Sequence, residues 1–273
     1  MIDKAVVGTR VDRASTDAPV LAIADPDAKP LPSLWVTTPI FDEGEQVGRR
    51  FGELYPNPAQ DDEEGWDGLD FGGGYYDEGM EHQSPDELPL RIACFQAAET
   101  LYLHAALRGN DIAFLCLGYV YSYDRCQGNY QSWEGLSLFE DAEGNPSLDE
   151  KAYRCFAQAA DAGYPEACYK LGDMLARGRG CAKDETLACQ LYRRAFEGAR
   201  GDRPVTWGSA ALRLGSAYEY GNGVKQSFEE ALRWYKQAQT GLELAVEGGD
   251  WYYEKALASA ERGVKRAQQE LLG

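Results

Sequence analysis

Two stretches of equal length decide the fold: ACYKLGDMLARGRGCAKDETLACQLYRRA at residues 167–195 and AALRLGSAYEYGNGVKQSFEEALRWYKQA at residues 210–238. In each stretch Leu-Gly stands four residues after the first Ala, a Gly-x-Gly follows, and the end has the pattern Ala-x2-(Leu/Trp)-Tyr-x2-Ala. A pattern that returns after a few tens of residues is typical of an array of stacked supersecondary units. The remaining sequence contains further, less regular copies of both halves of this pattern.

Four helices with the same apolar face are predicted from the second half of the pattern. The apolar face of each starts at an Ala, has Leu, Cys, Trp, Tyr or Phe three and four residues later, and has another Ala seven residues later. Positions i, i+3, i+4 and i+7 form one face of an α-helix. The small Ala residues let a neighbouring helix approach this face closely. We call these four the first helices, and their apolar faces are counted from a starting Ala at Ala98, Ala152, Ala188 and Ala231.

A second set of helices is predicted from the first half of the pattern. Each carries an Ala and a Leu four residues apart, at Ala113/Leu117, Ala167/Leu171, Ala210/Leu214 and Ala267/Leu271. Gly109, Gly163 and Gly263 each precede such an Ala by four residues, where we expect the turn that joins the two helices of a pair.

The Gly-x-Gly elements are predicted to be tight reversals after two of the second helices. They lie at Gly178–Gly180 and Gly221–Gly223, and glycine permits the positive φ that such a reversal needs. A nucleotide-binding loop is excluded, because the element follows a helix instead of a strand and lacks a third Gly.

The combined pattern resembles the Sel-1-like repeat family, which is related to the tetratricopeptide repeats and has a slightly longer unit. The resemblance covers roughly residues 90–273 and is most specific at 167–195 and 210–238. It implies an α-solenoid that serves as an adaptor or scaffold, and members of the family are usually not enzymes. We therefore predict an all-α protein, a right-handed α-solenoid of about four antiparallel helix pairs with an irregular acidic N-terminal region.

Two regions are predicted from composition and spacing. Residues 1–86 form an acidic, Pro/Gly-rich N-terminal region, and residues 87–273 form the solenoid. The solenoid is predicted to hold an insertion at 126–146, because Ala98 and Ala152 stand 54 residues apart where the regular unit has 36. Gly241 and Gly263 both resemble the glycine that joins a pair, so residues 242–261 are predicted to be an inserted helical extension.

The N-terminal region carries most of the net charge of −18. Residues 1–89 contain 20 acidic and 6 basic residues, whereas residues 90–273 contain 25 and 21. We predict that residues 61–81 form an irregular acidic segment. The alternative is that the aromatic side chains of this segment dock onto the solenoid or onto a partner. A calcium loop beginning at Asp61 is disfavoured, since its Gly falls at the fifth instead of the sixth place. The aromatic residues of the segment at 61–81 are Trp66, Phe71, Tyr75 and Tyr76.

Several classes of partner and compartment are disfavoured by composition. An acidic chain lacks the Lys/Arg surface that displaces counterions from nucleic acid. No stretch approaches the ~20 apolar residues of a membrane span, and the first 30 residues lack the apolar core of a secretory signal. Seven Cys without close pairs suit a reducing compartment, so we expect a cytoplasmic protein.

No catalytic, cofactor-binding or metal-ligating set is indicated by spacing. The sequence has only two His, His82 and His104, and no Cys-x2-Cys, which disfavours a zinc site. His104 is expected to be structural. Cys155 and Cys181 occupy places where other repeats have an apolar residue, so they are interpreted as small core residues.

One set of polar residues is a candidate binding surface. Positions two, five and six residues after the starting Ala lie off the apolar face of a first helix, and in a solenoid these helices usually line the concave surface. These positions are either solvated helix surface, with Arg stems covering apolar neighbours, or a basic groove for a carboxylate-rich peptide. We call them the cation row: Arg154, Gln158, Gln190, Arg193, Arg194, Arg233, Lys236 and Gln237.

These features favour a non-enzymatic protein–protein interaction scaffold that binds a peptide or protein segment on its concave face. A first alternative is a regulatory or immunity-type protein that binds a basic partner through its acidic N-terminal region. A second is an exported Cys-rich repeat binder or an enzyme. In a further hypothesis the acidic N-terminal region occupies the groove of the same chain.

Overall fold

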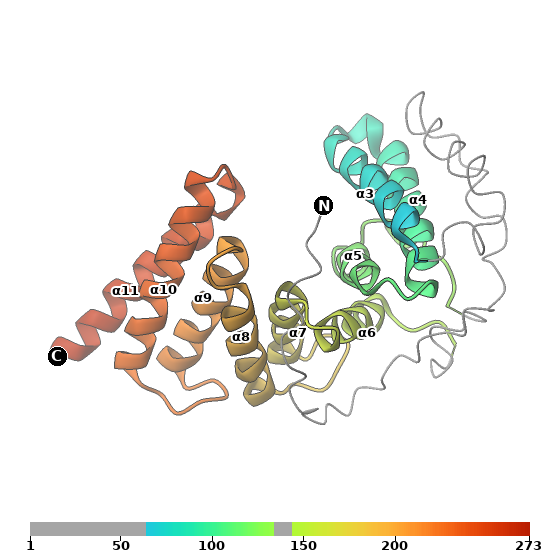
Figure 1. Ribbon diagram of the computed structural model, residues 1–273. Coiled ribbons are helices and arrows are strands. Elements are labelled where there is room, and N and C mark those ends of the chain that lie inside the picture. Colours follow the sequence, from blue (N-terminus) through green and yellow to red (C-terminus); the bar gives the residue numbers. More distant parts are fainter. Residues whose placement is uncertain (1–63, 134–143) are drawn as a thin grey trace. The chain divides into compact units, whose positions relative to one another are not determined.

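The computed structural model describes residues 64–133 and 144–273, and within these ranges every regular element is a helix (Figure 1). The described residues form two compact units, which meet in sequence at Ala159 and Ala160. The N-terminal unit contains α3 (Trp66–Glu81), the 3₁₀ turn η2 (Pro85–Glu87), α4 (Leu88–Leu107), α5 (Asp111–Ser122) and most of α6 (Leu148–Asp161). The C-terminal unit contains α7 (Pro165–Arg177), α8 (Glu185–Ala199), α9 (Pro204–Tyr220), α10 (Phe228–Glu247), the 3₁₀ turn η4 (Trp251–Tyr253) and α11 (Glu254–Leu272).

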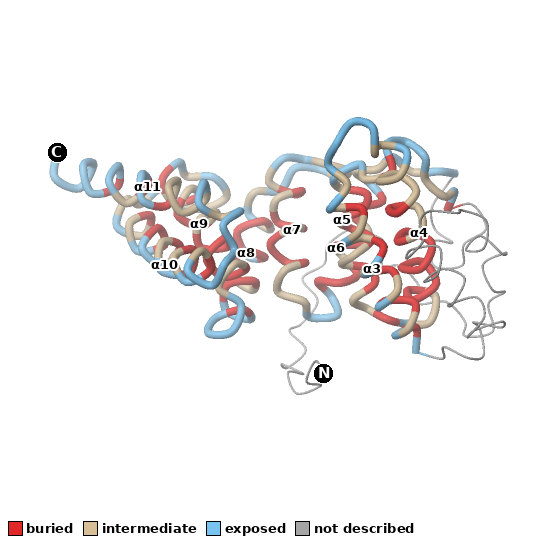
Figure 2. Tube along the Cα trace, turned by 90° about the horizontal axis from the view of Figure 1, so that it is seen from above, coloured by how far each residue is buried: buried red, intermediate tan, exposed pale blue. Residues whose placement is uncertain are grey.

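The predicted helix pairs are confirmed in order and kind. The first helices are α4, α6, α8 and α10, and the second helices are α5, α7, α9 and α11. The Ala that begins each apolar face is at most 1% exposed. Figure 2 shows the buried residues of each unit lying along the helix faces that meet inside that unit.

The Leu-Gly element is explained by aromatic rings that lie against the glycine. A Cβ added to Gly118, Gly172 or Gly215 would come within 2.5–2.7 Å of a ring carbon of the next first helix. The rings are those of Phe156, Tyr192 and Tyr235, the large residue four positions after the starting Ala. Glycine costs a helix interior about 1 kcal/mol relative to Ala, but here only glycine leaves room for the ring.

The predicted turns are confirmed, with one exception. All four glycines of the two Gly-x-Gly elements have φ between 66° and 75°, and Gly109 and Gly163 have φ of 81° and 100°. Gly263 was predicted to join the last pair, but it lies inside α11, where it leaves room for the Tyr235 ring. The last pair turns instead at Gly249, whose φ is 105°.

The two predicted insertions have different outcomes. Residues 242–261 do not form a separate extension, because α10 continues through Gly241 to Glu247 and α11 begins at Glu254. Gly241 lies inside α10, where its missing side chain allows close packing on Gly208 of α9. The insertion at 126–146 falls between α5 and α6, and its residues 134–143 lie outside the described residues.

The N-terminal region contains a helix that the sequence analysis did not predict. Residues 1–63 lie outside the described residues, but Trp66–Glu81 forms α3, which packs on α4. The prediction of an irregular segment at 61–81 is therefore wrong for Trp66–Glu81, the residues that form α3. Of its aromatic side chains, Tyr75 is buried and Tyr76 contacts Phe95 edge-on, whereas Trp66 is 40% exposed.

Glycines spaced by seven explain why α3 forms. Gly65, Gly72 and Gly79 face α4, and a Cβ on each would come within 2.7–3.0 Å of Ala105, Tyr102 and Phe95 respectively. Gly72 and Gly79 stand seven residues apart on one face of α3, whereas Gly65 is the N-cap of the helix, with φ of 69°. Tertiary packing therefore outweighs the poor helix propensity of this Gly-rich segment.

Two neighbouring glycines of α3 are expected to respond oppositely to Ala. Gly73→Ala should raise stability by about 0.5–1 kcal/mol, because nothing lies within 4 Å of its added Cβ and Ala favours the helix. Gly72→Ala should lower it by about 1–3 kcal/mol, because its Cβ would lie 2.7 Å from the Tyr102 ring. Urea unfolding followed by circular dichroism measures both. Stabilisation by both substitutions would contradict the packing of α3 on α4.

The C-terminal unit contains a carboxylate that ties three helices together. Asp173 of α7 accepts a hydrogen bond from the Tyr192 hydroxyl of α8 at 2.9 Å. Arg213 of α9 donates to both oxygens of the same carboxylate, from Nε at 2.9 Å and Nη2 at 2.8 Å. We call this arrangement the Asp173 bridge.

A second carboxylate repeats this arrangement one helix pair later. Glu219 of α9 accepts from the Tyr235 hydroxyl of α10 and from Arg266 of α11, whose Nε and Nη2 lie at 2.6 and 2.8 Å. We call this the Glu219 bridge. Each bridge joins the second helix of one pair to both helices of the next pair.

Candidate functional site

The cation row is divided between the two units. Arg154 and Gln158 lie on α6, whereas the other six residues lie on α8 and α10 of the C-terminal unit. Gln158 is only 8% exposed, which disfavours direct contact with a ligand. The accessible residues of the row include Gln190, Arg233 and Lys236.

Three arginines of the cation row have bonding partners inside the chain. Arg193 lies over the Tyr218 ring and donates to its hydroxyl. Arg194 donates to the carbonyl oxygen of Ala160 at 2.7 Å. Arg233 forms an ion pair with Glu230 at 2.6 Å and lies over the ring of its neighbour Trp234. These contacts agree with the surface interpretation, and a ligand would have to compete with them.

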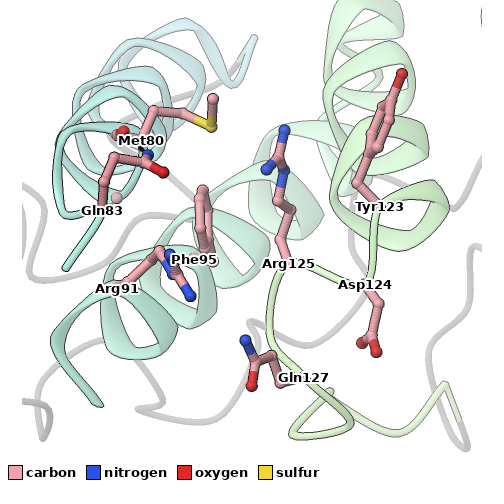
Figure 3. Close-up of a pocket in the computed structure, with 9 residues that line it drawn as sticks. Met80, Gln83, Arg91, Phe95, Tyr123, Asp124, Arg125 and Gln127 are labelled. Atoms are coloured by element: carbon pink, nitrogen blue, oxygen red, sulfur yellow. Dashed lines mark hydrogen bonds between the residues drawn. The ribbon is translucent and has the colours of Figure 1, made fainter. Parts of the chain in front are cut away.

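A pocket in the N-terminal unit was not predicted from the sequence. It has a volume of about 200 Å³ and lies between the C-terminal end of α3, the first turns of α4 and the turn after α5 (Figure 3). These three segments share no sequence pattern, so spacing does not reveal the site. The lining residues are Gly79, Met80, Gln83, Arg91, Phe95, Tyr123, Asp124, Arg125 and Gln127.

Arg125 is held at this pocket by aromatic rings. Its guanidinium carbon lies 5.0–5.6 Å from the ring centroids of Tyr123, Phe95 and Tyr76. Its Nε donates to the Tyr76 hydroxyl at 3.2 Å. Burial raises the pKa of Tyr76, although Arg125 opposes the shift, so the phenol stays neutral at pH 7. Figure 3 shows the Arg125 side chain extending beside Phe95.

The other polar groups of the pocket have different functions. Arg91 donates to the carbonyl oxygen of His82 at 3.4 Å. The Asp124 carboxylate accepts from the backbone N–H of Gly128 and from the Tyr130 hydroxyl, so it stabilises the turn. The lining residues offer two guanidinium groups, two amides and two aromatic rings, and they include no nucleophile with a neighbouring base.

A buried polar network anchors the turn after α5. The Glu99 carboxylate accepts from the Tyr121 hydroxyl at 3.0 Å and from the backbone N–H of Gln131 at 3.3 Å. Lys151 donates to the carbonyl oxygen of Gln131 at 3.0 Å and lies 5.2 Å from the centroid of the Trp133 ring. Burial raises the pKa of Glu99 to about 7 and lowers that of Lys151. The network fixes the segment that carries Arg125.

The cysteines and histidines largely follow the structural interpretation. All seven Cys are free thiols, and five of them, including Cys155, are buried. His104 is buried in α4. His82 differs, because the structure brings it together with Glu78 and Cys94, a grouping that the sequence analysis did not predict.

The fold is that of an all-α helical-repeat protein, with paired helices joined at positive-φ glycines. The chain carries Sel1 repeats: the Sel1 repeat family model matches residues 143–164, 165–198 and 208–238. This confirms the resemblance noted from the motifs. Proteins of this family are generally protein–protein interaction scaffolds, and their fold is typically non-catalytic.

Solved structures that are similar to this chain include the following two. A Sel1 repeat protein from Oxalobacter formigenes matches with a TM-score of 0.49 and 18% identity, covering 82% of this chain and 76% of its own. A protective antigen present in uropathogenic Escherichia coli strains, described as displaying an SLR fold, matches with a TM-score of 0.34 and 19% identity. That match covers 83% of this chain and 60% of the antigen. Within the described residues, no helix is both long and apolar enough to span a bilayer.

Proposed function

We propose that this chain is a non-enzymatic scaffold that binds an acidic segment of a partner protein and anchors one carboxylate side chain in the pocket of Arg91 and Arg125. The observation that carries the proposal is the presence of two guanidinium groups at one concave site on a chain of net charge −18. Because the chain as a whole is acidic, it repels an extended polyanion. The positive pocket therefore favours a short acidic segment.

The chemistry of the pocket suits a carboxylate on an apolar stem. Guanidinium groups form charge-assisted, often bidentate hydrogen bonds with carboxylates. The Gln83 and Gln127 amides supply further donors, and the Phe95 and Tyr123 rings supply apolar contact. A volume of about 200 Å³ is smaller than a typical small-molecule site and suits a single side chain or a chain terminus.

The cation row remains a second candidate for the same partner chemistry. Arg233 and Lys236 are exposed on α10, one helical turn apart on the side away from the core. An acidic segment lying along α10 would contact both. In this proposal the partner replaces the Glu230 carboxylate that now neutralises Arg233.

A basic partner for residues 1–63 remains a separate proposal. It is supported by the charge of the N-terminal region, which lies largely outside the described residues. If that region instead occupies a basic site of the same chain, removing residues 1–63 should strengthen the binding of an acidic peptide. A deletion to residue 86 is unsuitable for this test, because it also removes α3.

Charge reversal separates the two candidate surfaces. Binding of a labelled Glu-rich peptide, measured by fluorescence anisotropy, should weaken about tenfold or more in Arg91→Glu, which loses charge-assisted hydrogen bonds. The triple variant Arg193→Glu, Arg194→Glu, Arg233→Glu should bind like the wild type if the pocket is the anchor, and should lose binding if the cation row is.

The control variant is Arg262→Glu, which makes the same charge change on the exposed surface of α11. A Gln-rich peptide of equal length tests whether the carboxylates are needed. Unchanged affinity in both Arg91→Glu and the triple variant would overturn both proposed surfaces.

A further inference from the structure

Three potential metal ligands converge where α3 ends and α4 begins. Glu78 and His82 are four residues apart at the end of α3, and Cys94 lies on α4. One carboxylate oxygen, one imidazole nitrogen and the thiol sulfur all lie within 4.8 Å of one another. Gly79 permits this approach, because a Cβ there would lie 3.2 Å from the Cβ of Cys94.

The imidazole of His82 is oriented by a second carboxylate. Its Nδ1 lies 3.3 Å from Oε1 of Glu87, and its Nε2 lies 4.0 Å from Oε1 of Glu78. Glu87 is itself fixed, because its Oε2 accepts from the backbone N–H of Ser84 at 3.1 Å and from the Ser84 hydroxyl at 2.7 Å. A neutral imidazole that donates from Nδ1 to a carboxylate presents the lone pair of Nε2, as in carboxylate–histidine–zinc arrangements.

We propose that Glu78, His82 and Cys94 bind a divalent transition-metal ion, with zinc as the best match. Imidazole and thiolate favour zinc over magnesium and calcium, which prefer all-oxygen sites. Three protein ligands leave a fourth position of a tetrahedral site for water or for a group from a partner.

The present distances are close to those of a bound site. Zinc bonds of about 2.0–2.3 Å place tetrahedral ligand atoms about 3.3–3.8 Å apart. The ligand atoms here therefore need to approach by about 1 Å. The side chains of Glu78 and His82 are 26% and 20% exposed, so both have room to rotate, whereas Cys94 is fixed in the core.

The proposed site has a structural consequence for the neighbouring pocket. Gly79, Gln83 and Arg91, which line the pocket, lie within a few residues of the proposed ligands and their carboxylate partner. A bound ion would fix the end of α3 against α4 and thereby fix this wall. The inference goes beyond the proposed function and does not depend on it, since metal binding is measured without any peptide.

Cobalt titration of the full-length apo protein tests the site. One equivalent of Co²⁺ should produce the visible absorption of a tetrahedral site and the near-ultraviolet charge-transfer band of a thiolate ligand, and one equivalent of Zn²⁺ should abolish both. Zn²⁺ should also raise the unfolding temperature, because the ion binds the folded state. No thiolate band and no thermal shift would overturn the proposal.

Variants identify the ligands and separate this site from the other six thiols. Cys94→Ser should abolish the thiolate band, and Glu87→Gln, which removes no ligand, should weaken binding about 10–100-fold. The control Cys181→Ser, on a partly exposed thiol of the C-terminal unit, should leave the titration unchanged. Loss of the band in Cys181→Ser, or wild-type affinity in both Cys94→Ser and Glu87→Gln, would place the ion elsewhere and refute the assignment.

Discussion

Gly223→Ala is expected to destabilise the C-terminal unit by about 3–5 kcal/mol, because it combines backbone strain with a contact that cannot relax. Gly223 has φ of 71°, a conformation that Ala adopts at a cost. A Cβ there would lie 2.1 Å from the carbonyl oxygen of Glu185 and 2.7 Å from the backbone nitrogen of Thr186. Both are backbone atoms of the first turn of α8, so relief requires movement of a helix.

The other glycine of the same turn provides a matched control. Gly221 has φ of 75°, but the nearest atoms to its added Cβ lie at 3.5 Å or more. Gly221→Ala should therefore cost only the backbone strain, about 1–2 kcal/mol. Urea unfolding gives the two free energies, and hydrogen exchange of the first turn of α8 should increase in Gly223→Ala alone. Equal losses would show that the close approach to Glu185 is absent.

Gly221 and Gly223 have different roles in the turn between α9 and α10. The Gly-x-Gly element was predicted as a turn, and both glycines do have positive φ. In this repeat the second glycine has an additional role, since it lets the turn before α10 lie against the start of α8. The element thus sets the packing of neighbouring repeats, which positions α10 and its exposed Arg233 and Lys236.

Helix positions were predictable because Ala and the large apolar residues recur with helical spacing in each unit. Helix α3 was missed because its Asp and Gly content indicates disorder when the segment is considered alone. It forms because glycines seven residues apart fit against the side chains of α4, which is visible only in three dimensions. The turn of the last helix pair was misassigned because Gly263 lies inside α11. Its missing side chain leaves room for the Tyr235 ring instead of permitting a turn.

The candidate sites were less predictable than the fold. The cation row was found because its residues recur at fixed positions of the first helices. The pocket of Arg91 and Arg125 and the cluster of Glu78, His82 and Cys94 combine residues from separate segments at unrelated spacings. The two carboxylate bridges were missed for a related reason, since Asp173 stands one residue after the Leu-Gly element and Glu219 stands four residues after it.

Asp173→Ala is expected to destabilise the C-terminal unit by about 2–4 kcal/mol, because it leaves Arg213 without its carboxylate and Tyr192 without its acceptor. The side chains of Asp173 and Arg213 are only 18% and 30% exposed, so water compensates little. Asp173→Asn should lose less, because the amide oxygen still accepts one hydrogen bond. The control Asp202→Ala, on an exposed acid of the same unit, should stay within about 0.5 kcal/mol of the wild type.

Acid titration tests the same bridges without a substitution. Burial alone would raise the pKa of Asp173, but the charge and hydrogen bonds of Arg213 outweigh it and lower the pKa. Hydrogen bonds from Arg266 lower the pKa of Glu219. A carboxylate with a lowered folded pKa contributes its full stability above the unfolded value, about 4, and loses it as the pH falls through the folded value. The C-terminal unit should therefore lose stability below about pH 4.

The N-terminal unit should respond to acid with the opposite sign. Burial raises the pKa of Glu99 to about 7, so its contribution is greatest below the unfolded value of about 4.3 and is lost as the pH rises through 7. Hydrogen exchange followed separately for α4 and α9, corrected for intrinsic rates, distinguishes the two units. Between pH 7 and 5 protection should increase in α4 and stay constant in α9. A parallel change in both helices would show that the Glu99 network and the carboxylate bridges do not act on separate units.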